Sequence, residues 1–383
     1  MDNSRSYDVA VIGGGLAGLS AALLLARAGH RTVLFEKGSY PAHKVCGEYV
    51  SHESWSFLQH LGIPLEDLDL PSIDRLVLTA PNGAAFRTRL ALGGFGISRY
   101  RLDALLADAA RNAGVTLFEE SRVEEVREGS GFLLRVRHKS GERVEYNVRA
   151  CCGAWGKKSN LDVQGKRAFL EEQDRRLGNF IGVKYHVEAD WPPNEIGLHN
   201  FPGGYCGISQ VEEGRYCVCY LAHAPALRDR GGSLPRFEQE VLSVNPHLKK
   251  IFSESRVLAP FPVTIAQVSF ASKKRVEGGV LMLGDAAGMI SPLCGNGMSI
   301  ALHTGKIAAE LLGEHLHGRL RRDDLETAYD RAWRRLFGPR LWRGRLLQRF
   351  FGGTHTSNAF VGLFRALPAL AGPVIRSTHG EIF

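Results

Sequence analysis

The sequence predicts an α/β protein with α+β elements: a discontinuous Rossmann-type nucleotide-binding domain with a β-meander, a second domain around an antiparallel sheet, and a helical C-terminal region. Three observations support this prediction. A glycine-rich turn joins an apolar strand to a helix near the start, alternating apolar runs fill the middle, and an arginine-rich amphipathic segment follows residue 330. The first pattern is typical of a β-α-β unit that binds a dinucleotide, and the second of strands with one buried face.

The composition is that of a globular protein. Of 383 residues, 44% are apolar and 23% are charged, which excludes a disordered, collagen-like or coiled-coil chain. The 44 glycines indicate either flexible segments or backbone that closely approaches a ligand. The net charge of +8 is compatible with nucleic acid or an anionic membrane as a partner. Seven cysteines without a Cys-x-x-Cys pair, and a start that lacks a secretory signal pattern, lead us to expect no metal site, a reducing compartment and a cytoplasmic location.

The glycine-rich turn has the spacing of a dinucleotide-binding fingerprint. Gly13 allows the tight turn, Gly15 lets the backbone approach a pyrophosphate, and Gly18 lets the helix pack closely on the strand. The unpaired N–H groups at the start of that helix favour phosphate. Glu36 ends the next predicted strand, where a carboxylate binds ribose hydroxyls and disfavours the 2′-phosphate of NADP. NAD and FAD both remain compatible with this unit.

A second glycine-rich segment lies far along the chain. The apolar run 279–283 predicts a strand that places Asp285 at its carboxyl end. Gly295 and Gly297 precede a long amphipathic helix, which we expect at 299–316. This arrangement suits a second contact zone for an extended cofactor, because a helix N-terminus stabilises negative charge.

Four segments resemble one superfamily of flavoproteins. Gly284-Asp285 resembles the Gly-Asp motif of the FAD-dependent aromatic hydroxylases (p-hydroxybenzoate hydroxylase-like) and geranylgeranyl reductases. In that superfamily the aspartate binds the ribitol chain and the following helix points at the flavin. The loop 41–51 resembles the K-x-C-G loop of the geranylgeranyl reductases, 97–103 resembles their R-x-x-L/F-D-x-x-L element, and 201–205 resembles their Phe-Pro strand pair. The resemblance implies FAD as the cofactor and places the chain nearest to the geranylgeranyl reductase-like branch.

The resemblance also implies functional residues. Cys46 and Glu48 are the candidate catalytic acids, although a small residue that fits a tight loop is an equally good interpretation of Cys46. Phe201 and Tyr205 are the candidate substrate-binding residues, although Tyr205 is equally compatible with packing within the sheet. The candidate FAD-binding residues are Gly13, Gly15, Ala17, Gly18, Glu36, Lys37, Cys46, Gly47, Arg99, Val123, Gly284, Asp285, Gly295, Asn296, Gly297 and Met298.

One position departs from the family pattern. The superfamily usually has an Asp-Gly pair after the meander, and Trp155 stands at the aspartate position here. This puts direct reduction by a nicotinamide cofactor in doubt, so the electron donor, either NAD(P)H or a redox protein, stays open.

The order of the predicted elements implies a discontinuous domain. Three strands separated by short polar turns, at 122–127, 132–138 and 143–150, predict the meander. The expected organisation is an FAD-binding domain over 1–64, 96–164 and 266–320, a substrate domain over 65–95 and 165–265, and a C-terminal helical region over 321–383.

The C-terminal region combines charge with large apolar side chains. From Arg331 to Arg349 there are seven arginines and no acid, and Gly338-Pro339 predicts a break between two short helices. Such helices either contact a membrane peripherally or form a solvated face whose aromatic side chains pack on the main body. We expect no nucleic acid partner, because no recognised binding module accompanies the charge.

Three functions follow from this sequence. The first is a reductase that transfers hydride from reduced FAD to a C=C bond of a hydrophobic prenyl, polyene or polyketide-like substrate. The second is a flavin monooxygenase that hydroxylates an aromatic or polyketide substrate through a C4a-hydroperoxide. The third is a membrane-surface electron-transfer flavoprotein. The Cys-Gly loop and the Phe-Pro segment favour the first.

Overall fold

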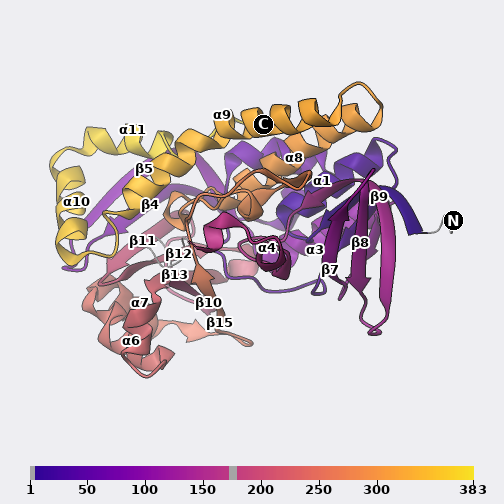
Figure 1. Ribbon diagram of the computed structural model, residues 1–383. Coiled ribbons are helices and arrows are strands. Elements are labelled where there is room, and N and C mark those ends of the chain that lie inside the picture. The colour runs from indigo at the N-terminus through magenta and orange to yellow at the C-terminus, as the bar shows by residue number, and fades with distance from the viewer. Residues whose placement is uncertain (1–4, 172–178) are drawn as a thin grey trace.

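Two β-sheets with helices around them form the protein, and a computed structural model describes its residues 5–171 and 179–383 (Figure 1). The first sheet has the order β16-β17-β9-β1-β2-β6, with β7 and β8 continuing from β9. Its strands are β1 (Ser6–Ile12), β2 (Thr32–Phe35), β6 (Thr116–Phe118), β7 (Arg122–Glu128), β8 (Phe132–Arg137), β9 (Arg143–Gly153), β16 (Val276–Glu277) and β17 (Val280–Met282).

The core of the first sheet is parallel. Strand β1 pairs in parallel with β2 on one side and β9 on the other, and β9 pairs in parallel with β17. These strands are apolar without alternation because both faces of this part of the sheet are covered. Helices pack on one face, and the meander contributes to the other, where His138 and Tyr146 contact Phe35 of β2. The carboxyl ends of the parallel strands meet at one edge, the place where open parallel sheets bind ligands.

The second sheet is mainly antiparallel and has the order β14-β10-β13-β12-β11-β4-β5-β3, with β15 also paired to β10. Strand β3 lies within the segment expected in the first domain, yet it pairs with β5. The strands are β3 (Tyr49–Ser51), β4 (Ser72–Thr79), β5 (Ala85–Gly96), β10 (Phe180–Glu188), β11 (Glu195–Phe201), β12 (Gly204–Gln210), β13 (Tyr216–His223), β14 (Arg256–Val257) and β15 (Val263–Val268).

The two faces of the second sheet have different surroundings. On one face, apolar side chains of β10, β12 and β13 pack against side chains of short helices, among them Phe237 and Leu248. The opposite face carries Lys184, His186 and Cys217, which lie against the loop that contains Cys46. This second face is the one turned toward the glycine-rich motifs.

Helices cover the first sheet and extend along the top of the molecule (Figure 1). Helix α9 runs unbroken from Arg322 to Gln348, so the expected break at Gly338-Pro339 is wrong. Phe337 and Leu341 are buried on either side of the proline, and this packing favours a continuous helix. The helices are α1 (Leu16–Arg27), α2 (Trp55–His60), α3 (Arg99–Asn112), α4 (Asn160–Gln164), α5 (Ala224–Arg228), α6 (Leu234–Glu240), α7 (Pro246–Glu254), α8 (Gly297–Leu316), α9, α10 (Thr354–Ala366) and α11 (Ala371–Arg376).

The predicted fold class and meander agree closely with these elements. The three meander strands lie within one to three residues of their expected bounds. Helix α8 begins two residues earlier than expected, because the glycine turn itself starts the helix.

Helices α1 and α8 pack closely because Gly305 has no side chain. A Cβ at Gly305 would lie 2.2 Å from Ser20 Oγ and 2.6 Å from Ala17 O, both on α1. Contact at this distance brings the first glycine-rich motif, at the start of α1, next to the second, at the start of α8.

We expect the substitution Gly305→Ala to lower the free energy of unfolding by about 1–3 kcal/mol, because the new methyl group forces the helices apart. The control is Gly313→Ala in the same helix, where a Cβ would meet only His30 Nε2 at 3.9 Å. That change should be neutral or stabilising by up to about 1 kcal/mol. Urea unfolding of both variants is the measurement, and equal stability of the two would contradict the close packing.

Candidate functional site

The first glycine motif is a cradle in which side chains do not fit. Gly13 has φ +106° and a Cβ there would lie 2.5 Å from Ala154 O, while a Cβ at Gly18 would lie 2.0 Å from Gly13 O. Gly15 is the N-cap of α1. The free N–H groups at the start of α1 are therefore open to a phosphate-sized group.

Glu36 and Arg99 flank this cradle. The Glu36 carboxylate accepts hydrogen bonds from the N–H groups of Gly14 at 2.7 Å and Gly38 at 2.8 Å. The Arg99 guanidinium lies 3.7 Å from the position of a Cβ on Gly15. A cation thus stands beside the helix N-terminus, which adds to the attraction for a pyrophosphate.

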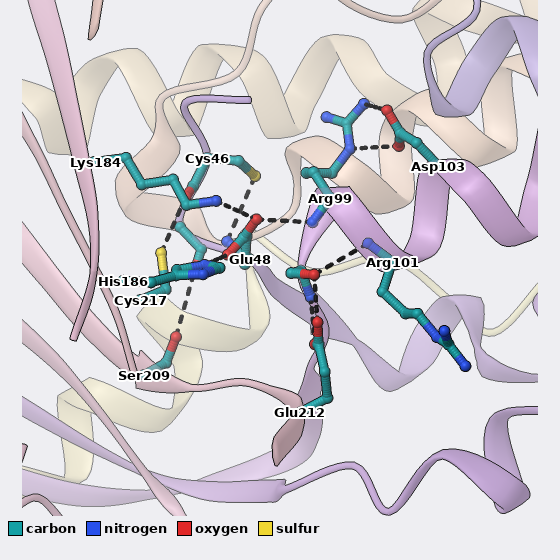
Figure 2. A network of polar contacts seen from close by, with 12 residues as sticks. Cys46, Glu48, Arg99, Arg101, Asp103, Lys184, His186, Ser209, Glu212 and Cys217 are labelled. Atoms are coloured by element: carbon teal, nitrogen blue, oxygen red, sulfur yellow. Dashed lines mark hydrogen bonds and ion pairs between the residues drawn. The ribbon is translucent and has the colours of Figure 1, made fainter. Parts of the chain in front are cut away.

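Arg99 is held by a buried ion-pair network. Its Nε donates to Asp103 Oδ1 at 2.7 Å and its Nη2 to Asp103 Oδ2 at 2.8 Å (Figure 2). Lys44 Nζ donates to the same carboxylate at 2.7 Å. Burial raises the pKa of Asp103, but the charges and hydrogen bonds of Arg99 and Lys44 lower it by more than burial raises it. The net shift of the pKa is therefore downward. The carboxylate stays ionised and orients Arg99.

The second glycine motif packs directly on the first. A Cβ at Gly284 would lie 3.3 Å from Ala17 Cβ, and the Gly284 N–H donates to Thr304 Oγ1 at 2.9 Å. Strand β17 ends just before this point, so Asp285 stands at the same sheet edge as Gly13 and Glu36.

The side-chain oxygens of Asp285 and Asn296 are hydrogen-bond acceptors that lack a donor among the described residues. The Asp285 side chain is half-buried, and no donor in the described part of the chain hydrogen-bonds its carboxylate. Burial raises its pKa, which Lys273 partly opposes. Asn296 Oδ1 is buried and also has no partner among the described residues. Buried acceptors of this kind call for donors from a bound molecule, such as hydroxyl groups.

The loop between Cys46 and Tyr49 joins the two motifs. The Tyr49 ring lies 3.1 Å from the position of a Cβ on Gly295. Gly47 O accepts from Ser209 Oγ at 3.2 Å, and Cys46 O accepts from Cys217 Sγ at 3.2 Å. The loop is therefore fastened to the second sheet.

Glu48 is the centre of a second buried network (Figure 2). Its Oε1 accepts from the Arg99 N–H at 2.7 Å and from Lys184 Nζ, and its Oε2 lies 2.6 Å from His186 Nε2. Burial raises the Glu48 pKa, but the hydrogen bonds and charges of His186 and Lys184 outweigh it and the net shift is downward. Glu48 is thus a carboxylate at neutral pH.

The Cys46 thiol lies beside this carboxylate. Its Sγ accepts a hydrogen bond from the Glu48 N–H at 3.5 Å. Burial raises its pKa, and the Arg99 charge only partly offsets that effect. Cys46 is therefore a protonated thiol with a cation near enough to stabilise its thiolate.

An apolar pocket lies between the second sheet, the second glycine motif and the C-terminal helices. Leu78 and Leu198 line it from the sheet, Leu293 and Gly295 from the motif, and Phe351 from the segment after α9. The pocket meets Tyr49 and Gly295 at the end of the loop that carries Cys46 and Glu48.

The candidate residues predicted from the sequence lie in several different environments. Phe201 and Tyr205 do not line this pocket: Phe201 is fully buried against Tyr220, and Tyr205 packs edge-on against Phe351. Trp155, at the expected aspartate position, donates from Nε1 to Asp162 at 3.0 Å. Ala17 and Met298 are buried, Val123 is buried in β7, and Lys37 and Gly47 are exposed.

Lys184 and His186 are not among the residues predicted from the sequence. Both alternate with apolar residues on β10, and two polar side chains on one face of an otherwise buried strand were the available signal. The C-terminal helices were not predicted as a pocket wall either, since no local pattern tells which distant strands they will cover.

Comparison with known proteins agrees with this geometry. Residues 6–338 match the family model described as "FAD binding domain". Digeranylgeranylglycerophospholipid reductase 2 of Methanothermobacter thermautotrophicus is 28% identical over 91% of this chain and 88% of its own length. Conditioned medium factor receptor 1 of Dictyostelium discoideum is 26% identical over 88% of this chain and 69% of its own.

Solved structures show the same fold. A geranylgeranyl bacteriochlorophyll reductase-like protein of Thermoplasma acidophilum has a TM-score of 0.79 at 22% identity, covering 99% of this chain and 97% of its own. The p-nitrophenol 4-monooxygenase of Pseudomonas putida has a TM-score of 0.76 at 17% identity, covering 98% of this chain and 99% of its own. At these identities the likeness concerns the fold alone.

We expect Asp285→Ala to weaken FAD binding about tenfold to a hundredfold, because one hydrogen bond to a charged acceptor is worth about 1.5–3 kcal/mol. Titration of the apoprotein with FAD, followed by flavin fluorescence, measures this. The matched control is Asp108→Ala, whose carboxylate is exposed on α3. Unchanged affinity in the Asp285 variant would remove this carboxylate from the FAD site.

We expect Glu48→Gln to lower the free energy of unfolding at pH 7 by about 3–5 kcal/mol, because it leaves Lys184 buried without a counter-charge. The pKa of Glu48 is lowered from its ordinary value of 4.5, so its contribution is present above that pH and is lost as the pH falls through the folded-state pKa. The difference between wild type and variant should therefore shrink in acid.

The control for this pH dependence is Glu238→Gln. Burial raises the Glu238 pKa, so its difference from wild type should change with pH in the opposite direction. Denaturant unfolding between neutral pH and pH 3 measures both. A Glu48 difference that does not vary with pH would contradict the lowered pKa.

Proposed function

The chain belongs to the FAD binding domain family and is an FAD-dependent oxidoreductase, and on that premise we propose that it reduces a C=C bond of a hydrophobic, prenyl-type substrate. The observation that carries this proposal is the apolar pocket that ends at Gly295 and Tyr49. Its walls are mainly leucine and phenylalanine side chains, which match a hydrocarbon chain better than a polar aromatic ring. The reductases among the relatives support the same substrate class.

The residues present fit FAD. We propose that the N–H groups at the start of α1 and the Arg99 guanidinium hold the pyrophosphate, that Glu36 binds the ribose, and that Asp285 binds the ribitol hydroxyls. Asn296 and the start of α8 would contact the flavin end. When bound and reduced, FAD supplies a hydride equivalent. The candidate FAD-binding residues named from the sequence are retained in this proposal.

Reduction of a C=C bond by hydride also requires a proton, and we assign its source to Cys46. The half-buried Cys46 thiol keeps its proton at neutral pH because its pKa is raised. Arg99 and Lys184 lie near enough to lower that pKa, and they would stabilise the thiolate left after proton transfer. Glu48 is less suited as the acid, since it is ionised and its oxygens already accept three hydrogen bonds.

Glu48 acts in this proposal as a positioning residue. Its carboxylate fixes the backbone N–H of Arg99 and the ammonium group of Lys184 at the same point. The Cys46 thiol, two residues away, accepts a hydrogen bond from the Glu48 N–H and is thereby held beside this carboxylate. Cys46 itself does not line the apolar pocket, which this loop reaches at Tyr49.

A hydrophobic lipid-like substrate is dissolved in a membrane rather than in water. The proposal therefore includes peripheral contact of the protein with a membrane. The electron donor is either NAD(P)H or a redox protein. Anaerobic mixing of the FAD-loaded protein with NADPH or NADH distinguishes the two, because a nicotinamide donor must reduce the bound flavin at a rate comparable with turnover.

The decisive experiment uses the FAD-loaded protein, reduced anaerobically with dithionite and mixed with a geranylgeranyl lipid in detergent. We expect reoxidation of the flavin without oxygen, together with a product that has gained two hydrogen atoms by mass spectrometry. Absence of anaerobic reoxidation, with formation of a hydroxylated or halogenated product only in oxygen, would overturn the reductase proposal.

We expect Cys46→Ala to slow alkene reduction by FAD-loaded protein about 10²–10⁴-fold, the usual contribution of a general acid. The matched control is Cys206→Ala, whose thiol lies in the core on the opposite face of the second sheet. Stopped-flow reoxidation with the lipid substrate measures both. A Cys46 variant as fast as the Cys206 variant would remove the thiol from the proton-transfer step.

A further inference from the structure

The last part of the chain has an unusual charge pattern. Between residues 331 and 380 there are nine arginines and no aspartate or glutamate. This segment forms the end of α9, then α10 and α11, which gather at one end of the molecule (Figure 1). Arg334 and Arg340 pair with Asp330 and Glu53, which lie outside the segment. The other arginines give the segment a positive potential that favours an anionic partner.

The same segment exposes large apolar side chains. On α9 and just after it, they recur every four residues and therefore lie along one stripe of the helix. Further exposed leucines follow in α10 and the turn after it. We call these six residues the docking face: Trp342 (63% exposed), Leu346 (41%), Phe350 (39%), Leu363 (45%), Leu367 (52%) and Leu370 (44%).

The helices that carry the docking face are apolar on their inner side as well. Phe351, Phe360 and Phe364 line the apolar pocket described above. Phe350, on the docking face, stacks on Phe360 with ring centroids 5.3 Å apart. At this place the pocket wall is two aromatic rings thick. A helix that is apolar on both sides is suited to a lipid environment.

Hydropathy supports the same conclusion. No single helix in the described ranges is long and apolar enough to cross a membrane. The segments Thr354–Ala366 and Pro368–Arg376 are long and apolar enough only when they are taken together, and the chain bends by 104° at the break between them. A bent apolar pair suits a segment that dips into one leaflet rather than one that spans the bilayer.

Arginines accompany the exposed apolar residues. Arg343 and Arg349 are exposed near the end of α9, and Arg365 is exposed two residues after Leu363. Guanidinium groups at this position would meet lipid phosphates while the neighbouring apolar side chains enter the acyl region. An anionic bilayer offers both phosphates for the arginines and hydrocarbon for the apolar side chains. Nucleic acid offers only the phosphates, so the combination favours a bilayer.

We propose that the docking face binds an anionic lipid bilayer and that substrate passes from the bilayer directly into the apolar pocket beside Phe350 and Phe360. This inference rests on the proposed function for the identity of the lipid that enters. Membrane binding itself needs neither substrate nor turnover, so it stands or fails separately.

The test is co-sedimentation of the FAD-loaded full chain with sucrose-filled vesicles that contain no prenyl lipid. We expect strong binding to vesicles of phosphatidylcholine mixed with phosphatidylglycerol, weaker binding to phosphatidylcholine alone, and loss of the difference in high salt. Vesicles with brominated acyl chains should quench the fluorescence of wild type more than that of Trp342→Phe.

The variant Leu363→Glu/Leu367→Glu should bind the anionic vesicles at least about tenfold more weakly, because two carboxylates oppose both the apolar and the anionic contact. Val244→Glu/Val257→Glu is the matched control, since those valines are 51% and 50% exposed outside the segment. Flavin absorbance and thermal unfolding verify that both variants are folded.

Wild-type protein that does not bind anionic vesicles at low salt would overturn the proposal. So would a docking-face variant that binds as tightly as the control variant. If wild type binds vesicles but reduced flavin is never reoxidised by a prenyl lipid, the proposed function fails and the docking surface remains.

Discussion

The buried carboxylate of Glu48 holds together parts of the protein that the chain brings from far apart. It joins the Cys46 loop to the start of α3 through the Arg99 N–H, and to β10 through Lys184 and His186. A charge in this position is costly unless every oxygen is paired, so the three partners must arrive together. The relative position of the two sheets is thereby restricted to one in which this pairing is complete.

The positions of Arg99 and of the Cys46 loop follow from this constraint. Arg99 is fixed at both ends, by Glu48 at its backbone and by Asp103 at its guanidinium, and it stands over the first glycine motif. The loop continues to Tyr49, which lies against Gly295 at the start of the second motif. A single loop therefore sets the distance between the charged end of the site and the mouth of the apolar pocket.

The pocket shows how distant segments combine. Strands β4, β5 and β11 provide one wall and the C-terminal helices provide the other. Neither wall has a motif, because each is an ordinary apolar surface until the other covers it. The arginine-rich end of the chain thus has two roles that a linear pattern does not separate: its inner side closes a cavity, and its outer side stays exposed.

The sequence by itself determined the fold class, the meander and the two glycine motifs, because glycine spacing and strand periodicity act locally. It also indicated the residues around Cys46 and Asp285. Only the tertiary structure decided that Phe201 and Tyr205 lie outside the pocket, that α9 continues through Pro339, and that Lys184 and His186 meet Glu48. Each of these depends on contacts between segments more than a hundred residues apart or on packing around a helix. Such contacts are set by the burial of whole surfaces rather than by the order of neighbouring residues.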